Sequence, residues 1–153
     1  MSQKTILRAT LLALLSITFY PAMADKNKRT IQFGSYTVHY NTLPTDFLSI
    51  KIAKQFKIVR SSKRILVNIA VKHNAKDSKT TAVPAKVTVR AHNMTGQLKY
   101  ADMRAVHDGK AIYYIGEFSV ANRERLNFTV TVTPKHKQAS TYSFKFKKKF
   151  MTQ

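Results

Sequence analysis

The chain has no cysteine and no tryptophan, and it has only four glycines and four prolines among its 153 residues. Without cysteine it can form neither a disulfide framework nor a thiolate metal site, and it lacks a cysteine nucleophile. The glycines do not cluster, which excludes a glycine-rich phosphate-binding loop. Only 7 residues are acidic against 27 Lys and Arg, so the formal net charge is +20.

The first 24 residues have the pattern of a cleavable secretory signal. Lys4 and Arg8 give a positive start, and the apolar stretch from Ala9 to Tyr20 is shorter than the ~20 residues that span a bilayer. The small residues Ala22 and Ala24 form the predicted cleavage site, and the cut precedes Asp25. We therefore predict a signal peptide at 1–24 and one domain at 25–153 without a transmembrane segment. An uncleaved N-terminal anchor is the alternative.

Loss of Lys4 and Arg8 with the signal peptide would leave the mature chain with a charge of +18. Such a surface attracts polyanions, whether lipid headgroups, acidic glycans or nucleic acid. Export disfavours nucleic acid, so the expected partner is an anionic envelope component or a periplasmic protein. The alternative is that the charge serves solubility alone.

Alternation of apolar and polar residues is the dominant pattern after residue 25, and it is typical of half-buried β-strands. It extends over residues 36–40, 64–72, 85–92, 126–133 and 142–147. Two more strands between Leu98 and Val120 form a predicted hairpin, in which Asp108-Gly109 is the turn and His107 pairs with Lys110. The second of these strands, Ala111 to Phe118, is apolar on both faces, so its outer face is expected to be covered or to form a contact surface.

One segment breaks the alternation. Thr45 can cap a short helix over Asp46 to Phe56. This helix would close one end or edge of the sheets, or it would contact a partner or a membrane. The pattern as a whole predicts an all-β fold, an immunoglobulin-like antiparallel β-sandwich of about seven strands with one short helix after the first strand. A small barrel is the alternative.

No motif with an identifiable chemistry is present. The five histidines have no metal-ligand spacing, and no GxSxG elbow occurs. Asp102 and Glu117 form the one carboxylate pair that the predicted hairpin brings to a common face. We therefore predict no catalytic residue, no cofactor and no metal site.

The last predicted strand carries a row of basic side chains on one face, namely Lys145, Lys147 and Lys149. Lysines in this position protect an edge strand against pairing with another sheet. The alternative is that they form a contact for an anionic surface.

Several segments together resemble a family of small bacterial periplasmic proteins, domain of unknown function 4426. These segments are Gly34–Asn41, Arg60-Ser61, Asn68–Val71, Asn93–Gln97 and Ala111–Phe118. The resemblance covers about residues 30 to 152, and the run Ala-Ile-Tyr-Tyr-Ile-Gly-Glu-Phe is its most specific element. It implies a bacterial periplasmic β-domain, and it brings no activity, substrate or catalytic residue.

These observations predict a periplasmic, non-enzymatic binding or interaction module of the cell envelope that contacts anionic envelope polymers or lipids. Two other functions stay open. One is a carbohydrate-active or other hydrolytic enzyme with a non-standard site near Asp102 and Glu117. The other is an assembly or chaperone-like factor that captures a partner strand at an exposed sheet edge.

Overall fold

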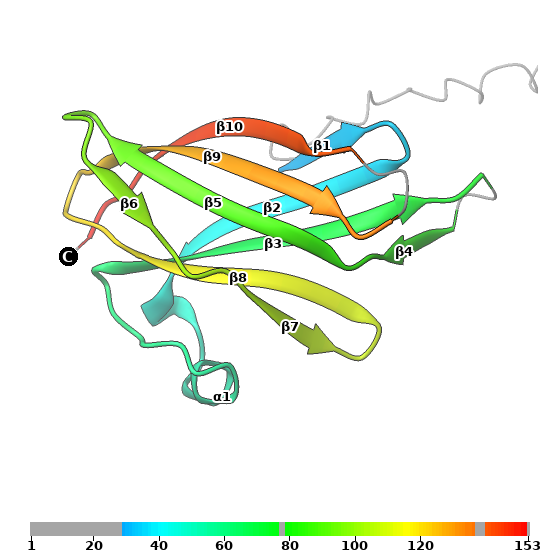
Figure 1. Cartoon of the computed structure of the whole chain (residues 1–153). Coiled ribbons are helices and arrows are strands. Elements are labelled where there is room, and N and C mark those ends of the chain that lie inside the picture. The colour runs from blue at the N-terminus through cyan, green and yellow to red at the C-terminus, as the bar shows by residue number, and fades with distance from the viewer. Residues whose placement is uncertain (1–28, 77–78, 137–139, 153) are drawn as a thin grey trace, which may run out of the picture.

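The computed structural model describes residues 29–76, 79–136 and 140–152 (Figure 1). Within these residues the chain forms ten strands, a short 3-10 turn at Thr45–Phe47 and the helix α1 at Ile50–Gln55. The strands are β1 (Thr30–Phe33), β2 (Tyr36–Pro44), β3 (Arg64–Asn74), β4 (Thr80–Ala82), β5 (Ala85–Asn93), β6 (Leu98–Tyr100), β7 (Arg104–Asp108), β8 (Ala111–Ser119), β9 (Arg125–Pro134) and β10 (Tyr142–Lys149).

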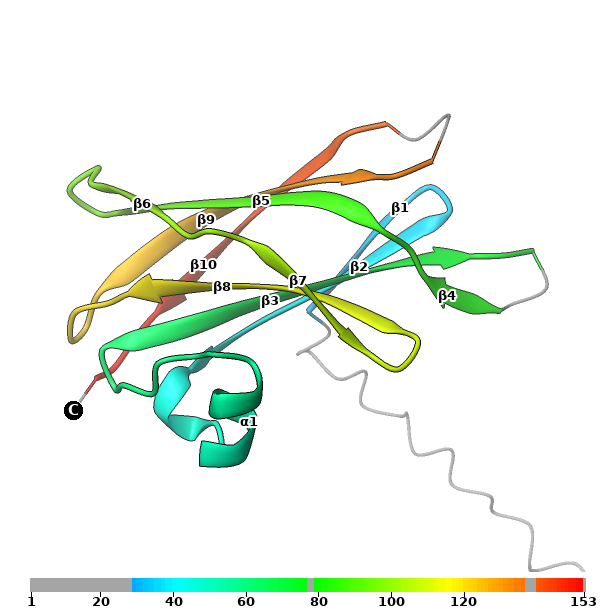
Figure 2. The same ribbon diagram turned by 60° about the horizontal axis from the view of Figure 1, so that its bottom comes forward.

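Two antiparallel sheets pack face to face, as Figures 1 and 2 show. The larger sheet has the order β1-β2-β3-β8-β7, with β4 paired to β3, and the smaller has the order β10-β9-β5-β6. The path β2-β3-β8-β7 against β5-β9-β10 reproduces the A-B-E-D and C-F-G order of an immunoglobulin constant-type domain. The predicted sandwich is therefore confirmed. The short strands β1, β4 and β6 are additions to its seven strands.

The core lies between the sheets and consists of the inward residues of the alternating strands. Val67 and Ile69 of β3 are fully buried, and so are Val130 and Val132 of β9. Burying an aliphatic side chain of this size contributes roughly 1.5–3 kcal/mol relative to leaving it in water. The alternation that is visible in the sequence thus supplies the main stabilising term of the fold.

Over β7 and β8 the predicted hairpin is correct in its faces and wrong in its register. Asp108 pairs with Ala111, so the two-residue loop is Gly109-Lys110 and not Asp108-Gly109. Gly109 has a φ of +56°, a conformation that glycine adopts without strain. A register change of two residues keeps each side chain on its predicted face, because the side-chain period of a strand is two.

The first arm of that hairpin is also divided between the sheets. β6 pairs with β5 in the smaller sheet, and β7 pairs with β8 in the larger one. The connecting residues Ala101 to Met103 pass over Gly116 of β8, where a Cβ would collide with the Met103 side chain. The missing side chain of Gly116 therefore lets the chain cross from one sheet to the other.

The predicted helix begins later than expected and has a different cap. Thr45 is buried, and its hydroxyl bonds both backbone groups of Ser61 instead. The cap of α1 is Ser49, whose Oγ accepts a hydrogen bond from the Ile52 amide at 3.2 Å. Below the helix, Ala53 packs with Leu66 and Ile115 on the outer face of the larger sheet. This contact confirms that the second apolar face of β8 is covered.

One buried hydrogen bond joins the two sheets directly. The amide of Ala85, at the start of β5, donates to the hydroxyl of Tyr114 on β8 at 2.6 Å.

We expect Tyr114→Phe to lower the free energy of unfolding by about 1–3 kcal/mol, because it leaves a buried amide without an acceptor. Urea unfolding followed by circular dichroism measures this. Tyr100→Phe is the matched control, since Tyr100 is 63% exposed. Equal stability of both variants and the wild type would contradict the assigned role.

Candidate functional site: a basic pocket between two edge strands

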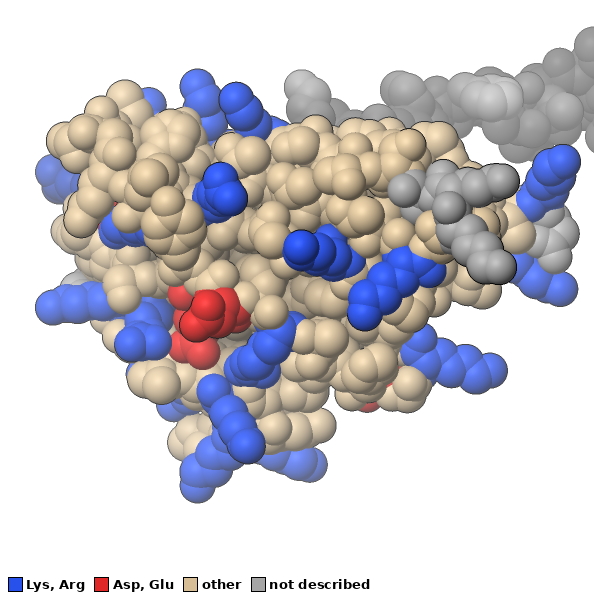
Figure 3. Space-filling view, in the orientation of Figure 1, with Lys and Arg blue, Asp and Glu red and all other residues tan. Residues whose placement is uncertain are grey.

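Positive side chains dominate the surface of the domain. In Figure 3 Lys and Arg project around the visible face, whereas Asp and Glu gather mainly in one place. A binding site differs from this general excess of cations because it holds its cations in a particular arrangement. One such arrangement occurs where the edges of the two sheets meet.

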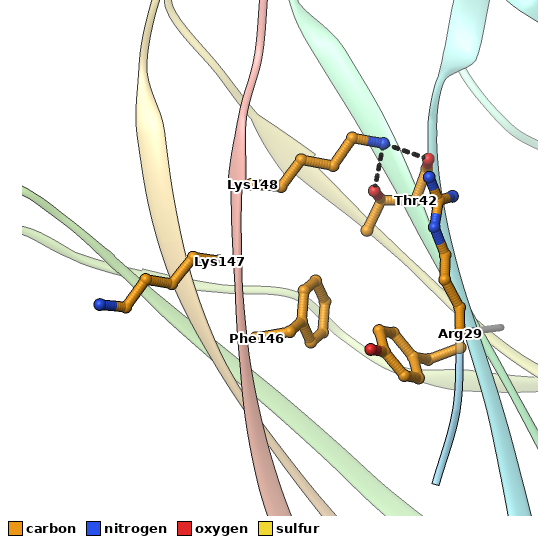
Figure 4. A pocket seen from close by; sticks show the side chains of 6 residues that line it. Arg29, Thr42, Phe146, Lys147 and Lys148 are labelled. Carbon is orange, nitrogen blue, oxygen red and sulfur yellow. Dashed lines mark hydrogen bonds between the residues drawn. The ribbon is translucent and has the colours of Figure 1, made fainter. Parts of the chain in front are cut away.

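That place is the seam between β2 and β10. β1 pairs with β2 only as far as His39, and one further bond joins the Tyr40 amide to the Arg29 carbonyl at 2.9 Å. Among the described strands, the end of β2 therefore has β3 on one side and no strand on the other. β10 is likewise the edge of its own sheet. A pocket of about 220 Å³ opens between these two edges (Figure 4).

An aromatic wall forms one side of the pocket. Tyr40 of β2 and Phe146 of β10 lie with their ring centroids 4.8 Å apart. Phe146 also stacks on Phe128 of β9 at 4.6 Å, so the wall is continuous with the core. A ring pair anchored in this way gives the pocket a fixed apolar surface against which a ligand can pack.

Lys148 is the best-positioned cation of the pocket. Residues of β10 alternate, and Lys148 falls on the same inward parity as Phe144 and Phe146. Its Nζ donates to the carbonyl oxygen and to the hydroxyl of Thr42, each at 2.7 Å, as Figure 4 shows. It also lies 5.4 Å from the centroid of the Phe150 ring. These contacts hold the ammonium group against the seam between the sheets.

The electrostatic environment of Lys148 is unfavourable to its own charge. Burial lowers the pKa of Lys148 below its ordinary value, and the positive charge of Arg29 lowers it further. Arg29 is itself oriented by a hydrogen bond from its Nη1 to the side-chain oxygen of Asn41. Of the six described residues that line the pocket, three are cations and none is acidic. An anion in this pocket would relieve the repulsion between its cations.

The structure places the predicted basic row as expected and adds residues that the sequence analysis missed. Lys145, Lys147 and Lys149 are all exposed on the outer face of an edge strand. Only Lys147 lines the pocket, together with the unpredicted residues Arg29, Tyr40, Thr42, Phe146 and Lys148. The sequence alternation of β10 could have shown that Lys148 points inward with Phe144 and Phe146. The place of Arg29 beside Lys148 could not be predicted, because it depends on the tertiary fold.

The carboxylate pair proposed for a hydrolytic site is not assembled. The segment from Ala101 to Met103 lies on the inner side of β8, beside Gly116. Glu117 has the opposite parity, and its carboxylate lies 3.4 Å from Arg64 on the outer face. Asp102 and Glu117 therefore do not face a common cleft.

The other positions named in the sequence analysis add no chemistry to the site. Within the described ranges, no group of three or more His, Asp or Glu could hold a metal ion. Burial, and then the charge of Lys72, lower the pKa of His39 on the outer face of β2. The predicted cleavage positions Ala22, Ala24 and Asp25 lie outside the described residues. None of the helices in the part of the chain that is described has the length and apolar character to cross a membrane.

A titration tests the environment of Lys148. Its pKa in the folded protein is expected to lie below that of the same lysine in the urea-unfolded chain, and Arg29→Gln should raise it towards that value. Between the two pKa values the unfolded chain binds the extra proton, so this group makes stability increase as the pH rises. NMR of the lysine ammonium groups gives the midpoints. Identical midpoints in the folded and unfolded chains would refute the buried contact with Thr42.

Comparisons with known proteins place the chain in a family. The family described as "Domain of unknown function (DUF4426)" matches residues 30–153. A DUF4426 family protein from Pseudomonas aeruginosa has a crystal structure similar to this chain, with 31% identity and a TM-score of 0.67 over 81% of this chain and 94% of that chain. A comparison with curated proteins finds no match.

Two structures of FetP from uropathogenic Escherichia coli have the same fold. One is a copper-bound variant and the other the protein as isolated, and each is 7% identical with a TM-score of 0.56. They match 81% of this chain and 90% or 93% of their own chains. At this identity the likeness shows the fold alone. The family match and the Pseudomonas structure confirm the resemblance seen in the sequence: the chain belongs to the DUF4426 family.

Proposed function

We propose that this protein is a periplasmic, non-enzymatic binding module of the cell envelope, and that its pocket between β2 and β10 binds an anionic group of an envelope glycan. The observation that carries the proposal is that Arg29 and Lys148 meet in one small pocket with no acidic residue among its described lining, whereas the side chain of Lys147 points away from them (Figure 4). The predicted signal peptide supports the location.

The shape and chemistry of the pocket favour an acidic sugar. A volume of about 220 Å³ is smaller than the pockets that enclose whole drug-sized molecules, so it suits one charged group with part of its sugar. Arg29 and Lys148 provide N–H donors for a phosphate or carboxylate. The rings of Tyr40 and Phe146 provide an apolar surface for the face of a sugar. A glycan of the envelope carries both parts.

A non-enzymatic role agrees with the residues at hand. General acid–base catalysis usually employs a carboxylate or an imidazole within hydrogen-bond reach of the substrate. The described lining offers cations, two aromatic rings and a threonine hydroxyl that is engaged by Lys148. Such a set binds and orients an anion.

Retention on immobilised lipopolysaccharide across a salt gradient tests the proposal. We expect the double variant Arg29→Gln/Lys148→Gln, which removes both cations of the pocket, to elute at clearly lower salt than the wild type. The control Lys86→Gln/Arg90→Gln removes the same charge from exposed positions of β5 and should elute close to the wild type. An equal decrease of the eluting salt concentration in both variants would show that only net charge matters. If the wild type is not retained at ~0.05 M salt, the proposal is wrong and the positive charge serves solubility.

A second candidate function, strand capture, is favoured by an open edge at β5. β6 pairs only with Arg90 to His92, so within the described sheets the residues 85–89 have β9 on one side and no strand on the other. The amides of Ala85 and Asn93 point away from β9, to Tyr114 and to Gln97. Val87 and Val89 share their parity and therefore aim their amides at the free edge. A groove of about 400 Å³ lies along this edge.

Amide hydrogen exchange tests this second candidate. In the free protein the amides of Val87 and Val89 should exchange faster than those of Lys86 and Thr88, which face β9. A captured strand would slow exchange at Val87 and Val89 selectively, because main-chain hydrogen bonds form there. Slow exchange of all four amides in the free protein would show that the edge is already closed.

A further inference from the structure

The segment between β2 and β3 forms a cap, residues 45–60, whose outer surface has no role in the fold. Ala53 and Ile58 are buried under it, and Phe56 packs beside them. Arg104 of β7 fastens the cap to the sheet by donating to the carbonyl oxygen of Phe56, and within the cap Arg60 donates to the carbonyl oxygen of Asp46. The cap is thus held by its inner residues, and its outer residues are free for another purpose.

Large apolar side chains are concentrated on that outer surface. Phe47 is 78% exposed, Ile50 is 60% exposed and Val59 is 57% exposed. With Ile52, the cap holds half of the eight large hydrophobic residues that are exposed in the described part of the chain. Single exposed apolar residues need no explanation, but a concentration of them in one short segment marks an interaction surface.

Cations alternate with these apolar residues. Lys51, Lys54, Lys57 and Arg60 are exposed, and Asp46 is the one carboxylate in the cap. Figure 3 shows Lys and Arg projecting at the lower end of the molecule, where Figure 1 places α1. The surface is therefore both apolar and strongly positive.

The arrangement favours a lipid surface over a folded protein partner. The centre of a protein interface is depleted of charge, whereas here Lys51 lies in the sequence between the exposed residues Ile50 and Ile52. At the boundary of an anionic bilayer both kinds of residue are satisfied together. Lysines contact the headgroups while apolar tips enter the edge of the acyl region. We propose that the cap is a docking surface for an anionic phospholipid bilayer.

This proposal does not depend on the glycan-binding function, because the cap and the pocket share no residue. The cap packs on the outer face of the larger sheet, whereas β10 is the edge strand of the smaller sheet (Figure 1). A variant of one surface can therefore be tested while the other is intact. The exposed residues of the cap can also be changed without opening the core.

Co-sedimentation with vesicles tests the proposal. The exported protein is mixed with vesicles of phosphatidylcholine alone or with 30% phosphatidylglycerol, chosen as about one anionic lipid in three. We expect binding only to the anionic vesicles. Lys51→Gln/Lys54→Gln should weaken it about thirtyfold, from the attraction of two cations near the surface. Phe47→Ser/Ile50→Ser should weaken it at least tenfold by removing the apolar insertion.

Matched variants at other sites separate the cap from the remaining surface. Met94→Ser/Leu98→Ser removes two comparably exposed apolar residues from the β5–β6 turn, and Lys86→Gln/Arg90→Gln removes two cations from β5. Both should bind anionic vesicles within about twofold of the wild type. The proposal is overturned if these controls lose as much binding as the cap variants, or if the pocket variant Arg29→Gln/Lys148→Gln alone abolishes binding. It is also overturned if the wild type binds neither kind of vesicle.

Discussion

The packing around Phe128 is the interaction on which the rest of the structure depends. Phe128 is fully buried in β9, and its ring meets Phe118 of β8 edge-on at 5.5 Å. On the other side it stacks on Phe146 of β10. One side chain thus joins the larger sheet to the smaller one and fixes the edge strand β10 against the core. Because the pocket uses Phe146 as its wall, its shape follows from this packing.

A lysine at an inward position of β10 is costly, and its surroundings suggest why it is tolerated. An inward charge on an edge strand can prevent pairing with another sheet, and Lys148 serves that purpose together with the outer lysines. Protection of the edge of β10 would need only one inward charge, however. Arg29 lies near Lys148, so burial and then the repulsion from Arg29 both lower the pKa of Lys148. This accumulation of like charge in one small pocket is better explained by an anionic ligand than by protection of the edge.

Most of the fold could be predicted because the strands of a sandwich leave a period-two pattern. The seven main strands and their buried faces follow from it, including the inward parity of Val130 and Val132. The division of the hairpin arm into β6 and β7 could not be predicted, since alternation continues through the crossing and only the contact with Gly116 reveals it. Thr45 and Ser49 are both good helix caps, and the bond of Thr45 to Ser61, 16 residues away, decided between them.

The family-specific segments acquire a physical meaning in the structure, and Tyr40 is the one residue of the described pocket lining that they contain. Asn93 shapes the β5–β6 turn, because its side-chain oxygen accepts hydrogen bonds from the amides of Thr95 and Gln97. In the run Ala111 to Phe118, Tyr114 joins the sheets and Gly116 admits the crossing chain. These are requirements of the fold. What distinguishes one such domain from another is then the surface that the fold leaves free.

In this chain we propose two such surfaces, the cap on the outer face of the larger sheet and the seam between the edge strands β2 and β10 (Figure 1). A domain docked on lipid through its cap would leave the pocket in the seam open to the polymers of the envelope, because the cap and the pocket share no residue. Each contact would raise the effective concentration of the domain for the other, so that two weak sites could give firm binding without any new contact. Under these two proposals, part of the large positive charge of the domain would serve two contacts at once, with a glycan at the pocket and with the bilayer at the cap.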